Sequence, residues 1–185
     1  MASIQPVACS LASRIITIRA ATAADVPSLT GMLLTTAADS PNVVTTPAEM
    51  AARLNRLPRI VAEYRINPGR LWLIALDGPD VVGELSCRCG SPARLAHNAQ
   101  LGMSVARTHR RMGIAHALLS TAVRWATEHP SIRRITLAVV ADHAVAINLY
   151  RKHGFVAEGR RHGHVRGTAD DYADDLMMAC FVKSG

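Results

Sequence analysis

The chain has 185 residues, of which 49% are hydrophobic and 19% are charged. This composition is typical of a globular protein with a sizeable core, and it excludes disordered and fibrous chains. The formal net charge of +7 favours anionic partners, which include phosphate-bearing cofactors and nucleic acid. The first residues lack the regions of a signal peptide, and no apolar run approaches the roughly 20 residues of a membrane span, so a soluble cytoplasmic protein is expected.

The chain is expected to begin with a flexible N-terminal extension over residues 1–13, followed by a single domain over residues 14–183. The sequence RIITIRAAT predicts a strand that leads directly into a helix over roughly residues 23–38. Thr22 is placed to cap this helix, because its hydroxyl can accept a hydrogen bond from a free backbone N–H group.

A second helix start is marked by Thr46, Pro47 and Glu49. A threonine with a glutamate three residues later forms a capping box, and proline is favoured at the first helical position. The helix is expected to run towards Ile66 and to break at Pro58, because proline cannot donate the backbone hydrogen bond of a helix interior.

Three strands are predicted next, at LWLIALD (71–77), VVGELSCRC (81–89) and AHNAQLGMSV (96–105). A basic turn follows, and apolar residues then recur at helical spacing from Gly113 to about Glu128.

The C-terminal part predicts a strand at RRITLAVV, a short helix and two antiparallel strands. The short helix is expected to have Asp142 as its N-cap and Gly154 just past its C-terminus. The element order is strand, two helices, three strands, helix, strand, helix and two strands. This order indicates a mixed α/β (α+β) fold in one domain.

The turn Arg110–Gly113 is a candidate phosphate site. A strand that turns into a helix presents free backbone N–H groups, and the helix dipole with two arginines adds positive charge there. Glycine allows the backbone to approach a ligand closely. Neither the P-loop pattern nor the dinucleotide-binding pattern is present, so the turn indicates a pyrophosphate cradle of another kind.

The pattern Arg110-x-x-Gly113-x-Ala115 resembles the [Q/R]-x-x-G-x-[G/A] signature of the Gcn5-related N-acetyltransferases (GNAT). Downstream, DHAVAINLYRKHGF is similar to the family segment D-N-x-x-A-I-x-L-Y-x-K-x-G-F. The tail EGRRHGHVRG…DYADDLMMA resembles the bacterial branch that acetylates amino acids and small amines. The resemblance covers roughly residues 15–181, and it implies a twisted, mainly antiparallel sheet with helices on both faces.

The resemblance implies an acetyl-CoA-dependent N-acetyltransferase whose acceptor, a small primary amine or amino acid, attacks directly in a ternary complex. It also implies that the backbone at 103–105 pairs with the pantetheine arm and that the amides at 110–115 hold the pyrophosphate. The implied cofactor-binding residues are Met103, Ser104, Val105, Arg110, Arg111, Met112, Gly113, Ile114, Ala115, His143 and Tyr150. His143 departs from the family, which usually has asparagine there to touch the pantetheine. No metal is expected.

Three residues are candidates for proton transfer. The resemblance places Tyr150 near the thioester sulfur, where a phenol of pKa about 10 can protonate a thiolate of pKa about 8.5. An acceptor amine has a pKa of about 10 and must lose a proton before it attacks. Glu84 and His97 are the candidate bases; their structural alternatives are an exposed strand face for Glu84 and a structural hydrogen bond for His97.

Other functions are open at this point. Cys87 could form an acyl-enzyme, although no activating histidine is adjacent to it in the sequence. Protein N-terminal or lysine acetylation is an alternative that would need an open groove. Nucleic-acid binding through the arginines is another alternative, which the scarcity of interleaved aromatic residues disfavours. Homodimers are common among similar proteins, so a homodimer is a further expectation.

Overall fold

The computed structural model describes residues 4–11, 13–40, 42–167 and 171–183 of the chain. The chain divides into two compact units. The first consists of the residues up to Arg88 together with Gly102–Trp125, and the second consists of Cys89–Leu101 together with the residues from Ala126 onward. Strand β5 (Asn98–Val105) contributes residues to both units.

The first unit is built on an antiparallel run of strands that follow one another in chain order. These strands are β1 (Val7–Leu11), β2 (Arg14–Ala20), β3 (Arg70–Asp77) and β4 (Asp80–Cys89), with β5 next in order. In the β3–β4 pair, Ile74 lies opposite Glu84 and Trp72 lies opposite Ser86.

Strand β1 differs from the expectation for the N-terminal residues. Val7–Leu11 pair with β2 over the whole length of β1, with Val7 opposite Ile18 and Leu11 opposite Arg14. A flexible extension therefore does not describe this part of residues 1–13. The alternation of half-buried and exposed residues in VACSL is typical of an edge strand, and its shortness explains why it carries little sequence signal.

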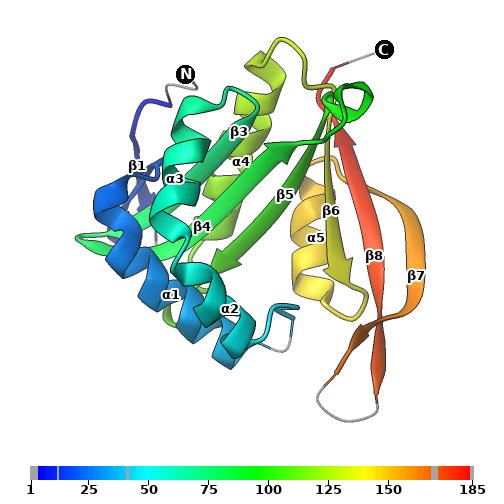
Figure 1. The fold of residues 1–185 in the computed structure, drawn as a ribbon, viewed down its shortest axis with the longest axis horizontal. Coiled ribbons are helices and arrows are strands. Elements are labelled where there is room, and N and C mark those ends of the chain that lie inside the picture. The colour runs from blue at the N-terminus through cyan, green and yellow to red at the C-terminus, as the bar shows by residue number, and fades with distance from the viewer. Residues whose placement is uncertain (1–3, 12, 41, 168–170, 184–185) are drawn as a thin grey trace. The chain divides into compact units, whose positions relative to one another are not determined.

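Helices cover both faces of the sheet in the first unit (Figure 1). On one face lie α1 (Val26–Asp39), α2 (Pro47–Leu54) and α3 (Leu57–Ile66), whose apolar side chains share a buried cluster with Ile74 and Leu76 of β3. On the other face lies α4 (Ile114–Glu128). A side-chain carbon added at Gly83 would meet Ile114 Cγ2 at 3.2 Å, which shows how closely α4 packs against β4.

The helix boundaries agree with the capping signals in part. The capping box at Thr46 is confirmed, because Glu49 N–H donates to Thr46 Oγ1 at 3.3 Å and Thr46 N–H donates to Glu49 Oε2 at 2.9 Å. The expected interruption is present and α3 ends at Ile66 as expected, but the break lies at residues 55–56 and not at Pro58: α2 ends at Leu54, and Pro58 lies in the first turn of α3. A proline is tolerated there because the first N–H groups of a helix have no partner within it.

The second unit contains strands in the order β5, β6 (Arg134–Val140), β8 (Tyr172–Phe181) and β7 (Val156–Arg166), with helix α5 (Ala144–Lys152) between β6 and β7 in the chain. Strands β5 and β6 are parallel, and the other pairs are antiparallel. The mixed α/β fold with a mainly antiparallel sheet is therefore confirmed.

Helix α5 begins one residue later than the sequence suggested. Its N-cap is His143 rather than Asp142, and His143 makes no side-chain cap hydrogen bond. The expected end is correct, since Gly154 follows the helix with a φ of 81°, a conformation that glycine adopts without strain. No helix among the described residues is long and apolar enough to cross a membrane.

Candidate active site

The turn between β5 and α4 is held by the side chain of its first arginine. A short 3₁₀ helix, η3 (Arg107–His109), follows the strand, and Arg110 Nε donates a hydrogen bond back to the carbonyl oxygen of Val105 at 3.1 Å. Arg110 has extended backbone, whereas Arg111 and Gly113 have φ values of 65° and 88°. The backbone therefore enters the left-handed region twice within four residues.

Free backbone N–H groups in a turn with left-handed residues can form an anion-binding concavity. Positive φ is uncommon for a residue such as Arg111 and is often found at functional sites. The first N–H groups of α4 have no partner within the helix. Arg110, Arg111 and Gly113 are exposed, so these donors and charges are open to a ligand. The turn fits a diphosphate.

A side-chain network anchors the same turn to the sheet. His109 Nε2 lies 3.2 Å from Asp77 Oδ2, and His109 Nδ1 lies 2.9 Å from Thr108 Oγ1. Asp77 at the end of β3 also pairs with Arg14. The hydrogen bond from Arg14, followed by that with His109, holds the pKa of Asp77 below its ordinary value. The turn is therefore fixed by a carboxylate that stays ionised.

Glu84 is a buried carboxyl group in the middle of β4, with only 6% of its surface exposed. Its partner is Trp72, whose Nε1–H donates to Glu84 Oε2 at 2.8 Å. Burial raises the pKa of Glu84 to about 7, and the Trp72 hydrogen bond and the charge of Arg53 act in the opposite direction. The exposed strand face, the alternative interpretation of Glu84, is wrong. A carboxyl group that titrates near neutral pH can take up and release a proton under ordinary conditions.

Two contacts place Glu84 relative to β5. Ala106 N–H donates to the carbonyl oxygen of Val82 at 2.9 Å, and a side-chain carbon added at Gly102 would lie 3.8 Å from Ser86 Oγ. In an antiparallel register these pairs put Ser104 opposite Glu84. Ser104 is the middle residue of the segment 103–105 that the resemblance assigns to the pantetheine arm. The first unit thus brings together the candidate base, this segment and the turn 110–115.

The other candidate residues belong to the second unit. His143 is half-buried at the start of α5, and Tyr150 is buried on the same helix with its ring 5.7 Å from the ring of Phe155. His97 is exposed in the turn before β5, and its carbonyl oxygen accepts a hydrogen bond from Arg133 N–H at 2.9 Å. His97 therefore lies at the opposite end of β5 from residues 103–105.

Residues 39–155 match the sequence model of the acetyltransferase (GNAT) family. The chain belongs to the GNAT family. It is therefore an acyltransferase, as its sequence indicates. Over 112 residues this GNAT protein is 35% identical to the L-amino acid N-acetyltransferase AaaT of Escherichia coli (strain K12), and the match covers 60% of the chain and 68% of the relative.

Solved structures agree with this assignment. The fold is similar to that of ribosomal-protein-alanine N-acetyltransferase from Brucella melitensis, with 25% identity, a TM-score of 0.75, and coverage of 89% of this chain and 98% of the other. It is also similar to a phosphinothricin acetyltransferase from Sinorhizobium meliloti in complex with AcCoA, with 22% identity and a TM-score of 0.76. That match covers 92% of this chain and 90% of the other, and it concerns the fold.

Two alternatives for the chemistry of this GNAT protein can be weighed against the structure. Cys87 has none of its surface exposed, so its sulfur is not open to a substrate in this conformation. Its side chain therefore gives no support to an acyl-enzyme. Among the described residues, no group of three or more His, Cys, Asp or Glu side chains could hold a metal ion.

Trp72 is the residue of this GNAT site that the sequence analysis missed. It lies within LWLIALD, which reads as a buried apolar strand, and nothing in that run distinguishes a core tryptophan from one that binds a carboxylate. The pairing depends on the register between β3 and β4, which brings positions 72 and 84 to the same face. A tryptophan diagonal to a lone acidic residue in the next strand is the signal that could have found it.

Proposed function

We propose that the protein transfers an acetyl group from acetyl-CoA to the primary amine of a small molecule, with an amino acid as the leading candidate. The observation that carries the proposal is Glu84, a buried carboxyl group with a pKa raised to about 7, opposite Ser104 on the neighbouring strand. The similarity to an L-amino acid N-acetyltransferase supports the choice of acceptor.

The residues of the first unit suit acetyl-CoA, which would supply an activated acetyl thioester. The exposed turn 110–115 offers backbone N–H groups and two arginines to a diphosphate, and residues 103–105 offer strand backbone to the pantetheine arm. A side-chain carbon at Gly113 would fill part of this turn and meet Leu11 Cδ2 at 3.3 Å, so the turn is shaped by the lack of a side chain there. In the second unit, His143 and Tyr150 are the proposed contacts.

Two groups of the chain would move protons. Glu84, whose pKa burial raises to about 7, can accept the proton of the acceptor amine near neutral pH. The amine then attacks directly, since the buried Cys87 offers no alternative nucleophile. Tyr150 Oη holds the proton that a departing thiolate needs. His97 is the less supported base, because it is exposed at the far end of β5 from residues 103–105.

A second acceptor class is a protein N-terminus or lysine; the similar structure from Brucella melitensis is named as a ribosomal-protein-alanine N-acetyltransferase. Release of free CoA, measured with a panel of amino acids, small amines and short peptides, separates the two classes. Turnover on peptides alone would favour protein acetylation. A cytoplasmic location and a homodimer stay predictions.

The basic test is binding of acetyl-CoA. At one hundred times its Kd, the cofactor should add about 2.7 kcal/mol to the free energy of unfolding. Thermal unfolding with and without acetyl-CoA, and with free CoA and ATP as comparisons, measures this effect. An absence of stabilisation, together with salt-dependent binding to DNA, would overturn the proposal in favour of nucleic-acid binding.

A further inference from the structure

We propose that Trp72 is a positioning residue for Glu84: its indole N–H holds Oε2 and leaves Oε1 as the oxygen that takes the proton of the acceptor amine. The inference rests on the proposed role of Glu84 as the base. Trp72 itself does not touch the reacting atoms; it acts through the carboxyl group.

The backbone sets up this contact. Trp72 lies opposite Ser86 and Ile74 lies opposite Glu84, so Trp72 and Glu84 are diagonal neighbours on adjacent antiparallel strands. Residues two apart in a strand share a face, which puts both side chains on the face covered by α1, α2 and α3. The indole bridges the two strands and reaches Oε2 at 2.8 Å.

The chemistry of indole makes the contact directional. An indole N–H is a donor only, so it pairs with an oxygen lone pair whether Glu84 is ionised or neutral. The carbonyl oxygen of a neutral carboxyl group is its better acceptor. Oε2 therefore keeps that role in both states, and the proton comes and goes at Oε1.

The indole is itself held by α3. The rings of Tyr64 and Trp72 are 5.2 Å apart with a tilt of 55°, and the guanidinium of Arg70 lies 5.4 Å from the centre of the Tyr64 ring. Arg70 also pairs with Glu63 at 3.2 Å. A cavity of about 260 Å³ lies against both rings. The indole also packs against the buried cluster under the helices, and on the side of the cavity Tyr64 and Glu84 are its contacts.

The charged groups around Glu84 explain what removal of the indole N–H would change. Burial raises the pKa of Glu84, while the Trp72 hydrogen bond and, from α2, the charge of Arg53 lower it. On α3, the pKa of Tyr64 is itself raised, mainly by burial, so this phenol is neutral in the range where Glu84 titrates. Loss of the Trp72 donor removes one of the two interactions that lower the pKa of Glu84. The pKa should therefore rise further, and Glu84 should stay protonated up to a higher pH.

The variant Trp72→Phe tests this, because it keeps an aromatic ring and removes the donor. The pKa of Glu84 sets the acid limb of kcat/KM, and this limb should move up by about one pH unit. The free energy of a hydrogen bond to a charged group corresponds to a pKa change of about that size. At neutral pH kcat/KM should fall about fivefold and should largely recover in alkaline buffer. Tyr64→Phe keeps the ring against the indole and is the matched control, with an unchanged acid limb.

A second measurement covers the case in which Trp72→Phe fails to fold. The chain has 2 tryptophans, so the wild-type indole N–H resonances can be assigned by NMR with a Trp125→Phe variant. The Trp72 resonance should titrate with a midpoint near the Glu84 pKa of about 7, and it should lose this titration in Glu84→Gln. A Trp72 resonance that stays constant across this range would overturn the inference.

The two proposals can fail separately. An active Glu84→Gln enzyme would remove Glu84 as the base, whatever Trp72 does. An inactive Glu84→Gln enzyme combined with a wild-type acid limb in Trp72→Phe would overturn only the positioning role.

Discussion

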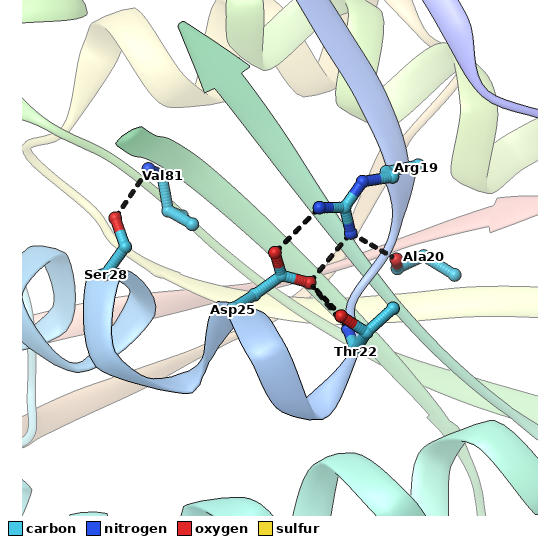
Figure 2. A network of polar contacts seen from close by, with 6 residues as sticks. All are labelled: Arg19, Ala20, Thr22, Asp25, Ser28 and Val81. Carbon is cyan, nitrogen blue, oxygen red and sulfur yellow. Dashed lines mark hydrogen bonds and ion pairs between the residues drawn. The ribbon is translucent and has the colours of Figure 1, made fainter. Parts of the chain in front are cut away.

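Arg19 and Asp25 form a two-point ion pair at the start of the first helical segment, with Nη1 to Oδ2 and Nη2 to Oδ1 both at 2.7 Å (Figure 2). The same carboxylate accepts hydrogen bonds from the backbone N–H and the hydroxyl of Thr22, each at 2.7 Å. Nearby, Val81 N–H donates to Ser28 Oγ at 2.8 Å. These contacts tie the beginning of the helical layer to β2 and to the start of β4.

The first prediction concerns acid stability. The hydrogen bond from Arg19 is the main cause that lowers the pKa of Asp25 from 3.8 to about 2. The stability that this pair contributes is complete above about pH 4 and is lost as the pH falls towards about 2. Asp25→Ala should lower the free energy of unfolding at neutral pH by about 2 kcal/mol or more, because it also leaves Arg19 without its partner.

Urea unfolding at several pH values measures this loss. Glu63→Gln is the control, because Glu63 is 42% exposed and pairs with Arg59 and Arg70 at the surface. It should change the free energy of unfolding by less than about 0.5 kcal/mol. Equal losses in the two variants would contradict the assignment.

The second prediction concerns the cost of keeping Glu84 in the interior. Its folded-state pKa of about 7 lies above the ordinary value of 4.5, so the folded state loses stability as the pH rises from about 4.5 to about 7. Glu84→Gln removes this loss, because glutamine has no charge to bury. At about pH 8 the variant should be more stable than the wild type by up to about 3 kcal/mol.

Below about pH 4 the difference between Glu84→Gln and the wild type should disappear, because both side chains are then neutral. Chemical unfolding in both pH ranges checks this. A difference that is constant with pH would show that Glu84 titrates in the folded state as it does in the unfolded state.

The third prediction concerns catalysis by Glu84. Glu84→Gln should lower kcat by about 10²-fold or more and should abolish the acid limb near neutral pH, while the acetyl-CoA Kd stays unchanged. His97→Ala is the comparison, and its pH–rate profile should match the wild type. If the two variants exchange these behaviours, His97 is the base.

The fourth prediction concerns Tyr150. Tyr150→Phe removes only the hydroxyl and keeps the ring next to Phe155, so the fold should be preserved. The turnover number should fall by about 10²-fold, as expected for the loss of a general acid, with acetyl-CoA affinity nearly intact. Steady-state rates and calorimetric titration measure the two quantities; unchanged turnover would remove Tyr150 as the acid.

The fifth prediction concerns the backbone at Gly113. Alanine at a φ of 88° is strained, and its side-chain carbon would lie 3.3 Å from Leu11 Cδ2. The turn should therefore shift, and the acetyl-CoA Kd should rise about tenfold, which corresponds to the 1–2 kcal/mol that an L-residue costs there. Calorimetric titration measures the change in Kd.

Gly31→Ala is the matched control, because a side-chain carbon at Gly31 in helix α1 would meet nothing within 4 Å. It should leave acetyl-CoA binding unchanged and should stabilise the helix by about 0.5–1 kcal/mol. Equal acetyl-CoA affinity in both variants would show that the conformation at Gly113 does not shape the cofactor site.

Local signals in the sequence were sufficient for the elements whose chemistry is local. The capping box at Thr46 and the helix end at Gly154 depend on residues within a few positions of each other. Strand β1 and the Trp72–Glu84 bond depend on the register between neighbouring strands, β1 with β2 and β3 with β4, and strand register is not encoded by any single run of residues. The burial of Glu84 likewise depends on strand register and not on its neighbours in the sequence.

A side-chain carbon added at Gly83 would lie 3.2 Å from Ile114 Cγ2 and 3.3 Å from Leu118 Cδ1, and this close packing has a consequence for how the enzyme can change. Gly83 and Glu84 are consecutive, so one short piece of β4 presents the proposed base on one face and, on the other, packs against α4, which begins at the proposed cofactor turn. A shift of the backbone at Gly83 would therefore also move Glu84. Variants selected for a new acceptor should therefore accumulate on the outer helices α1 to α3 and leave Gly83 and Glu84 untouched.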